Sequence, residues 1–330
     1  MKNIIILFFT VISIINGQEW GGRAGSFLRM GMTARSISMG GGFTAELDQN
    51  FPVLHNPAWS SFLVKRHFGT SYSNLTLDRR LASTSFAMAL PPTAGIGLAW
   101  IYGGVKDIQG RLSTGMKSSK MQTGENAFLI TFSQRIVPWL SVGANFKILR
   151  YDLPITDSDQ VSGTGIGFDI GFLIKSGSYT TIGIMIQDIS SNYQWDTNEL
   201  FAQGSVPIKE KFPTIYRIGS RYSRNGINIV GDIGVITETV IKEYSVSLDP
   251  DASYKSISIP KAMGVLPRIG LEYGFLEKYF FRGGYGNDRL AFGFGYKYEL
   301  FNRHDSNIDY AFSMDWVSQT AHTISYAFHF

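Results

Sequence analysis

The sequence has 330 residues, of which 17% are charged and 14% aromatic, with 36 glycines, no cysteine and a formal net charge of +4. Beyond the first residues, no apolar run approaches the roughly 18 residues of a membrane-spanning helix, which excludes a helical membrane protein. The lack of cysteine excludes a disulfide-stabilised fold, and the weak, scattered positive charge argues against a nucleic-acid partner.

Residues 1–17 have the parts of a secretory signal peptide. Lys2 supplies the positive charge, residues 4–15 form an apolar core interrupted by two hydroxyl side chains, and Gly17 is a small residue at the expected cleavage site. The apolar core is too short for a helical anchor. We therefore expect export, removal of this signal peptide, and a single folded domain in the mature chain.

Residues 18–66 do not alternate between apolar and polar residues, and they are rich in glycine. Short helices are expected at 33–39 and 59–65, with Pro57 just before the second. A segment that precedes the first strand of a wide barrel is well placed to fold into the lumen as a plug. We therefore expect residues 18–66 to form an N-terminal lumenal hatch.

From residue 67 onward, the chain divides into alternating apolar and polar runs separated by turn residues. Few charges with many aromatic residues and glycines favour strands that face lipid. There are fourteen such runs, an even number, as bacterial single-chain barrels require. Residues 67–330 are therefore predicted to form an all-β, transmembrane antiparallel β-barrel of fourteen strands. The strands are expected at 67–77, 80–90, 94–103, 124–135, 139–150, 163–175, 179–188, 212–222, 226–236, 266–275, 278–285, 289–300, 307–316 and 320–330.

The run 289–300 shows the alternation that a membrane strand requires. Leu290, Phe292 and Phe294 fall on one face, because successive side chains in a strand point to opposite sides. Lys297 and Glu299 fall on the other face. A Lys or Arg that faces lipid at the bilayer midplane costs about 2–4 kcal/mol, which explains this sorting.

The lengths of the connections give a separate test of the strand count. If residue 67 starts at the periplasmic side, the long links 104–123, 151–162, 189–211 and 237–265 all lie outside, and the links on the periplasmic side are short. Long external loops and short periplasmic turns are the expected asymmetry. Fourteen strands are therefore preferred, with twelve or sixteen as alternatives. Residues 242–248 could extend a hairpin above the membrane.

The run 320–330 is expected to be the closing strand. Ile324, Tyr326, Phe328 and Phe330 share the apolar face, whereas the opposite face carries small or polar residues. Tyr326, Phe328 and Phe330 are the expected C-terminal signal for the barrel-assembly machinery. The alternative is a strand of a soluble β-sandwich, which would bury this face and continue into a turn or tail.

The alternation also assigns charged side chains to the lumen, seven basic and six acidic. The simplest interpretation is a self-paired network that braces the wall and the plug, because an unpaired buried charge is costly. The alternative is a polar pathway or an anion-attracting constriction around Arg217, Arg221, Arg268 and Arg282. A charged lumen disfavours an apolar conduit, although Phe27, Leu28, Phe43 and Phe51 of the hatch could still line one. The lumenal charges are Lys147, Asp169, Lys175, Arg217, Arg221, Asp232, Arg268, Glu272, Arg282, Lys297, Glu299, Asp309 and Asp315.

The sequence carries no recognisable enzyme signature. It lacks a Gly-x-Ser-x-Gly nucleophile motif and a phosphate-loop lysine motif, and its five histidines have no metal-ligand spacing. We therefore expect no catalytic residues, no cofactor and no metal. A dispersed Ser/His/Asn triad that assembles only in space remains an alternative.

Three stretches of the N-terminal segment resemble a known family. Residues 24–31, 34–45 and 56–58, with Gly40-Gly41-Gly42-Phe43 and Asn56-Pro57 as the hatch motif, are similar to the amino-terminal signature of the PorV/PorQ family. Members of that family resemble the FadL long-chain fatty-acid transporters, which are fourteen-stranded barrels with an amino-terminal hatch. Trp59 departs from the pattern, since many relatives carry Gly there.

The resemblance implies a role in type IX secretion, in which PorV-like proteins receive folded cargo from a translocon and deliver it to a surface attachment machine. We therefore expect a non-enzymatic protein in the outer membrane of a diderm bacterium, in contact with outer-membrane lipid. The alternative is a FadL-like passive transporter of hydrophobic small molecules, and a purely structural barrel is third. The loop 237–265 is the leading site for translocon or cargo, through Tyr244, Leu248, Ile257 and Ile259.

Overall fold

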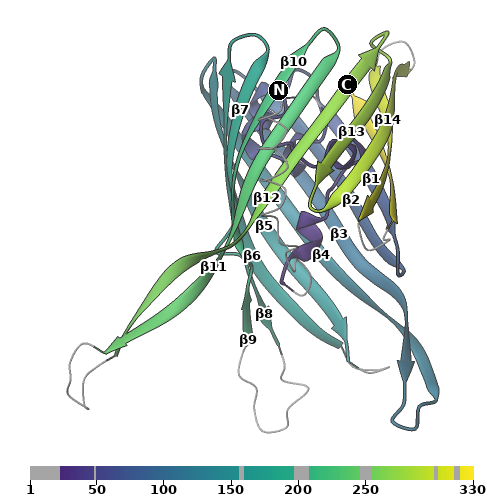
Figure 1. Ribbon diagram of the computed structural model, residues 1–330, viewed down its shortest axis with the longest axis vertical. Helices are drawn as coiled ribbons and strands as arrows, with labels where there is room; N and C mark the ends of the chain where they lie inside the picture. Colours follow the sequence, from purple (N-terminus) through teal and green to yellow (C-terminus); the bar gives the residue numbers. More distant parts are fainter. Residues whose placement is uncertain are drawn as a thin grey trace, which may run out of the picture.

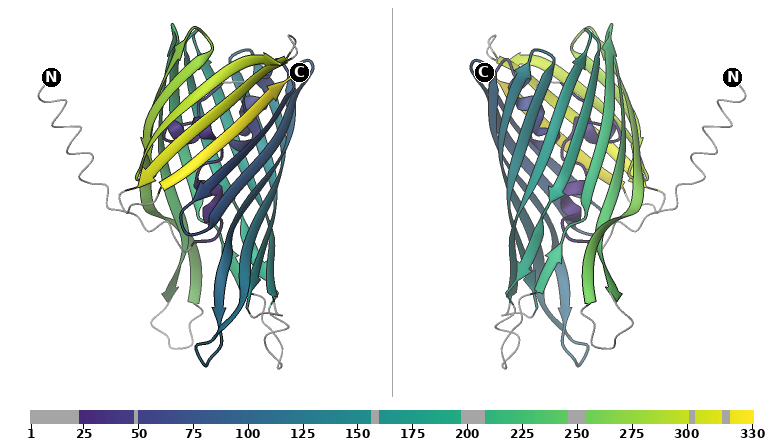
Figure 2. Two further views of the ribbon diagram at one scale, coloured as in Figure 1. Left: turned by 90° about the vertical axis from the view of Figure 1, so that its right-hand side faces the viewer. Right: turned by 90° about the vertical axis from the view of Figure 1, so that its left-hand side faces the viewer.

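A computed structural model describes residues 23–47, 50–155, 160–196, 208–245, 254–300, 304–315 and 320–330. The described chain forms a barrel of long tilted strands with helical turns inside it (Figures 1 and 2). Within this part of the chain, no helix is long and apolar enough to cross a membrane.

Fourteen strands close into an antiparallel ring. Each strand pairs with its neighbours in chain order, β10 follows β7, and the β1–β16 and β5–β6 pairings complete the ring. The predicted count of fourteen is confirmed, and twelve and sixteen are wrong. The strands are β1 His67–Leu75, β2 Arg79–Leu90, β3 Ala94–Arg111, β4 Lys117–Val137, β5 Leu140–Pro154, β6 Gln160–Ser176, β7 Thr180–Ile189, β8 Asn192–Trp195, β9 Ile208–Lys211, β10 Thr214–Arg224, β11 Ile227–Ser245, β12 Tyr254–Phe275, β13 Tyr279–Gly286, β14 Arg289–Leu300, β15 His304–Asp315 and β16 Thr320–His329.

Several strands extend into the long links, where the sequence indicated only that residues 242–248 could extend a hairpin; β11 continues through Lys242 to Ser245 in such a hairpin. β3 and β4 stay paired as far as Arg111 and Lys117, and β11 and β12 as far as Ser245 and Tyr254. The short hairpin β8–β9 was not predicted either. Once two strands are paired in the wall, the ladder can continue into water, because hydrogen bonding of the backbone does not depend on an apolar pattern. Trp316, the predicted end of one strand, lies outside the described residues.

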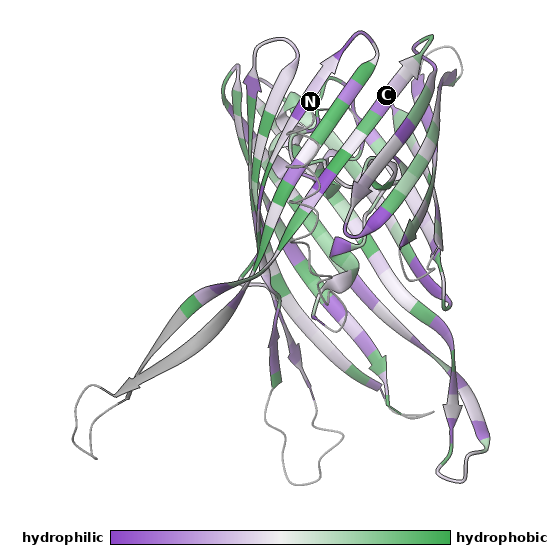
Figure 3. Cartoon of the chain, viewed as in Figure 1, coloured by the Kyte–Doolittle hydropathy of each residue, from purple (hydrophilic) through white to green (hydrophobic). Residues whose placement is uncertain are grey.

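The strands alternate between a lumenal and an outward face. In β1, every second residue is buried and the others are exposed. Many outward residues are large and apolar, for example Phe132, Ile233 and Phe281, which are each more than half exposed. Figure 3 shows hydrophobic and hydrophilic residues following one another along the strands. Closed barrels with such an exterior can cross a bilayer, since all backbone groups are paired and the exposed side chains match hydrocarbon.

The last strand joins the first as the alternation predicts. In β16, Ser325 and Ala327 are buried toward the lumen, whereas Ile324 is 58% exposed. Tyr326 lies opposite Thr70 and Phe328 opposite Phe68 of β1, with both aromatic residues half-buried. Phe330 is exposed and exchanges two backbone hydrogen bonds of 3.1 Å with Arg66 beyond the end of the ladder.

The N-terminal segment lies inside the barrel (Figure 2). It contains η1 Ser26–Arg29, α2 Ala34–Ser38, η2 Pro52–Leu54 and η3 Pro57–Phe62. α2 contacts β13 to β16, whereas η3 contacts β2 to β6, so the segment spans the width of the lumen.

The second predicted helix begins earlier than expected. η3 starts at Pro57 and ends at Phe62, because the Asn56 side chain caps it by accepting a hydrogen bond from the Ala58 N–H. A capping Asn followed by Pro at the first helical position is a strong helix start. Trp59, the position that departs from the family pattern, is fully buried in this turn.

The wall has unequal height around the ring. β11 and β12 have 19 and 22 residues, whereas β13 has 8. Pairing of β12 with β13 ends at Arg268 and Gly286, so the remainder of β12, from Tyr254 to Pro267, pairs only with β11. The β11–β12 hairpin then leaves the barrel, following a register shift at Ile236 and Thr237 (Figure 1). The short strands β13 to β16 therefore form a low rim beside the taller wall.

The outward apolar face can be tested with a single charge. Replacing Ile130, which is 49% exposed on the outward face of β4, with Lys should lower the free energy of unfolding by about 2–4 kcal/mol, because the ammonium would face hydrocarbon. The measurement is urea unfolding in lipid vesicles. Met116→Lys in the tip of the β3–β4 hairpin is the matched control, and an equal loss in both variants would contradict a membrane position for β4.

Candidate functional site

The glycines of the hatch motif let the N-terminal segment approach the barrel wall closely. Gly40 has a φ of +66°, and a Cβ added there would lie 2.4 Å from the carbonyl oxygen of Tyr285 and 2.6 Å from that of Ile269. No other residue type fits that position without moving the backbone of the wall. Gly41 also has positive φ, and Gly42 packs on Val230 of β11. Phe43, which follows them, is 3% exposed.

Asn56 joins the segment to the opposite wall. Its side-chain nitrogen donates to the carbonyl oxygens of Thr44, at 2.7 Å, and Phe172 of β6, at 3.3 Å. Beside it, a Cβ on Gly171 would lie 2.0 Å from the Asn56 Oδ1, so β6 needs glycine at this contact. Pro57 is the first residue of η3 and is buried. The hatch motif therefore attaches the segment at both sides of the lumen.

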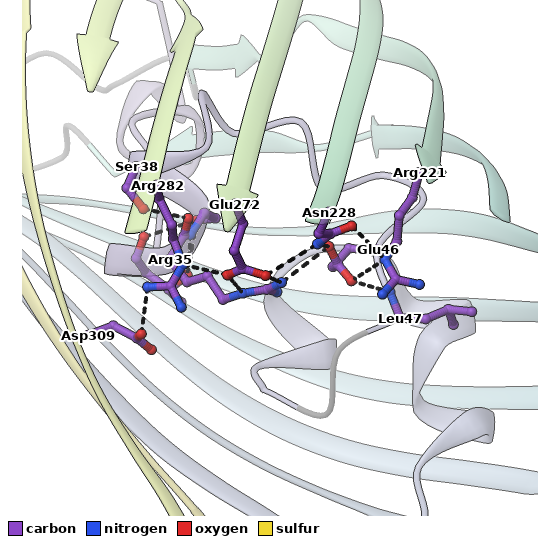
Figure 4. A network of polar contacts seen from close by, with 11 residues as sticks. Arg35, Ser38, Glu46, Leu47, Arg221, Asn228, Glu272, Arg282 and Asp309 are labelled. Carbon is purple, nitrogen blue, oxygen red and sulfur yellow. Dashed lines mark hydrogen bonds and ion pairs between the residues drawn. The ribbon is translucent and has the colours of Figure 1, made fainter. Parts of the chain in front are cut away.

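Buried ion pairs link the segment to the wall (Figure 4). Arg35 of α2 donates two hydrogen bonds of 2.8 Å to the Glu272 carboxylate of β12. Arg282 of β13 lies between Glu272, at 2.5 Å, and Asp309 of β15, at 2.7 Å. All four side chains are less than a tenth exposed. Removing one partner would leave an uncompensated buried charge.

The same network continues to β10 and β11. Glu46 of the segment is fully buried and accepts from Arg221 Nε at 2.8 Å and from Asn228 Nδ2 at 3.0 Å. Thr44 donates its N–H, at 3.1 Å, and its hydroxyl, at 2.6 Å, to Asp232 of β11. Segment and wall are therefore held together by charge-assisted hydrogen bonds, which are stronger than neutral ones.

A second buried cluster lies on the side of β5 to β7. Lys147 of β5 donates to Asp169 of β6 at 2.6 Å and also to Asp188 of β7. Arg29 of η1 lies 3.7 Å from the Asp188 carboxylate. Burial lowers the pKa of Arg29, and the Asp188 carboxylate counteracts that effect. The Arg29–Asp188 ion pair therefore joins η1 to β7, just as the Arg35–Glu272 ion pair joins α2 to β12.

Six of the lumenal charges singled out in the sequence fall into two groups. Arg221, Glu272 and Arg282 are ion-paired, and Asp232 accepts from Thr44, which supports the interpretation as a bracing network. The anion-attracting constriction cannot include Arg221 and Arg282, because Glu46 and Asp309 already compensate them. Arg217 and Arg268 form the second group. Within the described residues, neither has a carboxylate within 4 Å.

A cavity of about 900 Å³ lies between the N-terminal segment and the low side of the wall. The segment, β1, β2 and β13 to β16 supply most of its lining, and Arg217 and Arg268 line it from β10 and β12. Its apolar lining comes from both the segment and the barrel. These residues are Leu28, Met30, Met32, Ile37, Phe43, Leu54, Leu75, Leu81, Ala291 and Ala321.

The apolar character of this side of the lumen was missed from the sequence. The prediction weighed the inward charges of the strands and the apolar residues of the hatch, but not the inward apolar residues of the strands, and it therefore disfavoured an apolar conduit. Large apolar side chains also point inward on the five consecutive strands β1 to β5. The same two-residue alternation assigns them to the lumen, so the sequence could have predicted an apolar region there. These side chains are Leu75, Leu81, Ile101, Leu129 and Leu149, all buried.

The apolar hatch residues divide between the cavity and its surroundings. Leu28 and Phe43 line the cavity, and Phe27 is buried in the apolar cluster next to it. Phe51 is 2% exposed and packs edge-on against His67 of β1, away from the cavity lining.

Three of the four predicted partner residues belong to β11 or β12 and are not among the residues that line this cavity. Tyr244 belongs to β11 opposite Lys255 of β12, Ile257 lies opposite Lys242, and Ile259 is 37% exposed. Leu248 lies outside the described residues. Within the described parts of the chain, there is no cluster of three or more residues that could hold a metal ion.

No family model and no curated protein matches this sequence. Solved structures match its fold. The toluene transporter TbuX of Ralstonia pickettii has a TM-score of 0.61 and 16% identity, over 91% of this chain and 98% of that one. The toluene transporter TodX of P. putida has a TM-score of 0.62 and 15% identity, over 91% and 99%. A FadL homologue of Pseudomonas aeruginosa has a TM-score of 0.60 and 12% identity, over 91% and 98%. At these identities, the likeness establishes the fold alone.

The buried network predicts a large cost for removing its central carboxylate. Glu272→Gln should lower the free energy of unfolding by about 3–5 kcal/mol, because Arg35 and Arg282 would keep buried charges without their shared partner. The measurement is again urea unfolding in vesicles. Asp107→Asn, which removes an exposed partner of Lys120, is the control and should leave stability unchanged. Equal stability of Glu272→Gln and wild type would show that the network does not brace the segment.

Proposed function

We propose that this protein is an outer-membrane channel of a diderm bacterium through which small hydrophobic molecules cross passively. The single observation that carries the proposal is the cavity of about 900 Å³ with an apolar lining inside a barrel whose exterior suits lipid. Its volume lies in the range of about 300–1,000 Å³ typical of small-molecule sites. A water-filled pore would instead have a polar interior.

The energetics of the lining favour apolar solutes. Burial of apolar surface contributes roughly 25 cal/mol per Å², so a compact hydrocarbon gains several kcal/mol by leaving water for such a cavity. Leu28, Met30 and Met32 of the segment line this space together with Leu75 and Leu81 of the wall, and all five belong to one apolar cluster or pack against it. Methionine side chains adapt to differently shaped apolar ligands. The lining therefore suits a range of small molecules better than one rigid ligand.

The fold and the low rim support the same function. The solved structures with this fold include proteins described as toluene transporters and as a monoaromatic hydrocarbon channel. The cavity is lined by the turn Asn287–Asp288 and by neighbouring ends of β13 to β15. If the long hairpins lie outside the cell, as the loop lengths predict, a solute reaches the cavity over this low rim.

Filling the cavity should block the channel. Ala291→Trp on the inward face of β14 should lower the flux of a neutral probe such as toluene into protein-containing liposomes severalfold, because the indole would occupy space the probe needs. Phe292→Trp places the same ring on the outward face of β14 and is the control. A wild-type protein that gives no more flux than empty liposomes would refute the proposed function.

The second candidate is the role implied by the resemblance to PorV-like proteins, a partner of a type IX translocon and its cargo. The observation that favours it is the β11–β12 hairpin, which extends well beyond the barrel (Figure 1). Such a hairpin offers a surface remote from the cavity. Both functions are compatible in one chain, but the comparisons with solved structures give support only to the first.

Truncation of the hairpin tests the second candidate. Residues 240–259 are replaced by Asn-Gly, which forms a tight two-residue turn, in the native host. If the hairpin docks a translocon, cross-linking and co-purification should recover translocon components with wild type and lose them with the truncation. Replacing residues 108–121 of the β3–β4 hairpin in the same way is the control. Identical recovery with all three proteins would exclude the β11–β12 hairpin as the docking site.

A further inference from the structure

We propose that the end of the barrel with the short turns docks an acidic segment of a soluble periplasmic protein, through Arg135 of β4 and Lys175 of β6. Both residues lie near the ends of their strands, beside the turns 138–139 and 177–179. The loop lengths predict that these turns face the periplasm. Neither residue lines the cavity on which the proposed function rests, so the docking site does not depend on that function.

Both cations face inward, toward one aromatic ring of the N-terminal segment. Arg135 lies opposite Ser141 and Lys175 opposite Thr181, and both of these partners are buried. Residues directly opposite each other in a sheet share a face. The Lys175 Nζ lies 3.9 Å from the centre of the Phe62 ring, and the guanidinium carbon of Arg135 lies 5.9 Å from the same centre. Two strands of the wall thus bring like charges together over η3.

The two charges are held in place but not compensated. The Nη2 of Arg135 donates to the carbonyl oxygen of Pro92 at 3.3 Å. Among the described residues, no carboxylate forms an ion pair with Arg135 or Lys175. The face of the Phe62 ring attracts cations through its quadrupole but carries no net charge. A carboxylate supplied from outside would therefore relieve the repulsion between the two cations.

The surrounding turns and the segment beneath them carry no acidic residue. Arg224 of the next turn adds a further positive charge, over the ring of Tyr179 at 5.1 Å. Near β15, by contrast, Asp305 pairs with both Lys65 and Lys297. A one-sided positive potential of this kind selects a partner with complementary negative charge. The stretches without Asp or Glu are 51–66, 88–96, 132–141, 172–182 and 219–227.

The orientation of the two cations favours a soluble protein over a lipid headgroup. Arg135 and Lys175 are partly exposed, but they point into the mouth of the barrel and away from the bilayer. Apolar side chains are exposed at the same end, since Val64 directly after η3 is 83% exposed and Ile136 beside Arg135 is 59% exposed. A protein segment with acidic and apolar residues can use both features, as protein interfaces do.

The test uses two labelled peptides, one repeating Glu-Glu-Leu and one repeating Gln-Gln-Leu. Binding to the full mature protein in zwitterionic nanodiscs, which leave both ends of the barrel accessible, is measured by fluorescence anisotropy at low ionic strength, where charges are least screened. The glutamate peptide should bind at least about tenfold more tightly, because only its carboxylates can pair with the guanidinium and ammonium groups.

The double variant Arg135→Gln, Lys175→Gln should weaken binding of the glutamate peptide at least about tenfold and leave the glutamine peptide unaffected. Arg111→Gln, Lys117→Gln is the matched control. It removes the same charge from the tip of the β3–β4 hairpin, at the opposite end of the barrel, and should bind both peptides as wild type does.

Equal wild-type affinity for the two peptides overturns the docking site, whether or not the double variant folds. An equal loss in both double variants also overturns it, because the attraction would then follow the total charge of the protein. Unchanged peptide binding in a folded Arg135→Gln, Lys175→Gln protein, with loss of phosphatidylglycerol retained in native mass spectrometry, would assign the two cations to lipid instead and overturn the proposal. Toluene flux into liposomes tests the proposed function separately from all these results.

Discussion

A bilayer offers no hydrogen-bond partner to the backbone, and this constraint shapes the whole protein. Every N–H and C=O at membrane depth must pair within the chain, so the sheet has to close, here through β1–β16 and β5–β6. Closure assigns each strand one outward and one inward face. The outward face must be apolar, and the residues that remain free to carry specificity therefore point into the lumen or lie beyond the membrane.

The lumen is filled by the chain's own N-terminal segment, which uses small residues and paired charges. Glycines allow backbone contact on both sides, at Gly40 against β13 and at Gly171 against Asn56. Buried carboxylates such as Glu46 and Glu272 lie between arginines of segment and wall. Pairing of this kind limits the cost of taking charges out of water more than it adds stability. Arg217 and Arg268 differ from these arginines because neither has a carboxylate within 4 Å among the described residues, although Arg268 still donates a hydrogen bond to the Gly41 carbonyl oxygen of the segment.

The uneven height of the wall separates two surfaces. Beside the short strands β13 to β16, the cavity has both apolar and charged lining, whereas β11 and β12 continue past the barrel as a projecting hairpin. The same ring of strands can therefore serve a small-molecule path and a protein-binding hairpin at separate places. A shared fold with hydrocarbon transporters does not by itself assign either function, since function depends on the side chains of the site.

The sequence by itself determined the strand count, the alternation of faces and the closing strand, because lipid contact imposes a strict two-residue period that is local and readable. It also placed Arg217, Arg221, Arg268 and Arg282 inside the lumen by the same period. Only the tertiary structure decided that Glu46 pairs with Arg221 and Asp309 with Arg282, whereas Arg217 and Arg268 have no ion-pair partner among the described residues. Partners of an inward side chain come from strands and segments distant in the chain, and no local pattern encodes which of them meet.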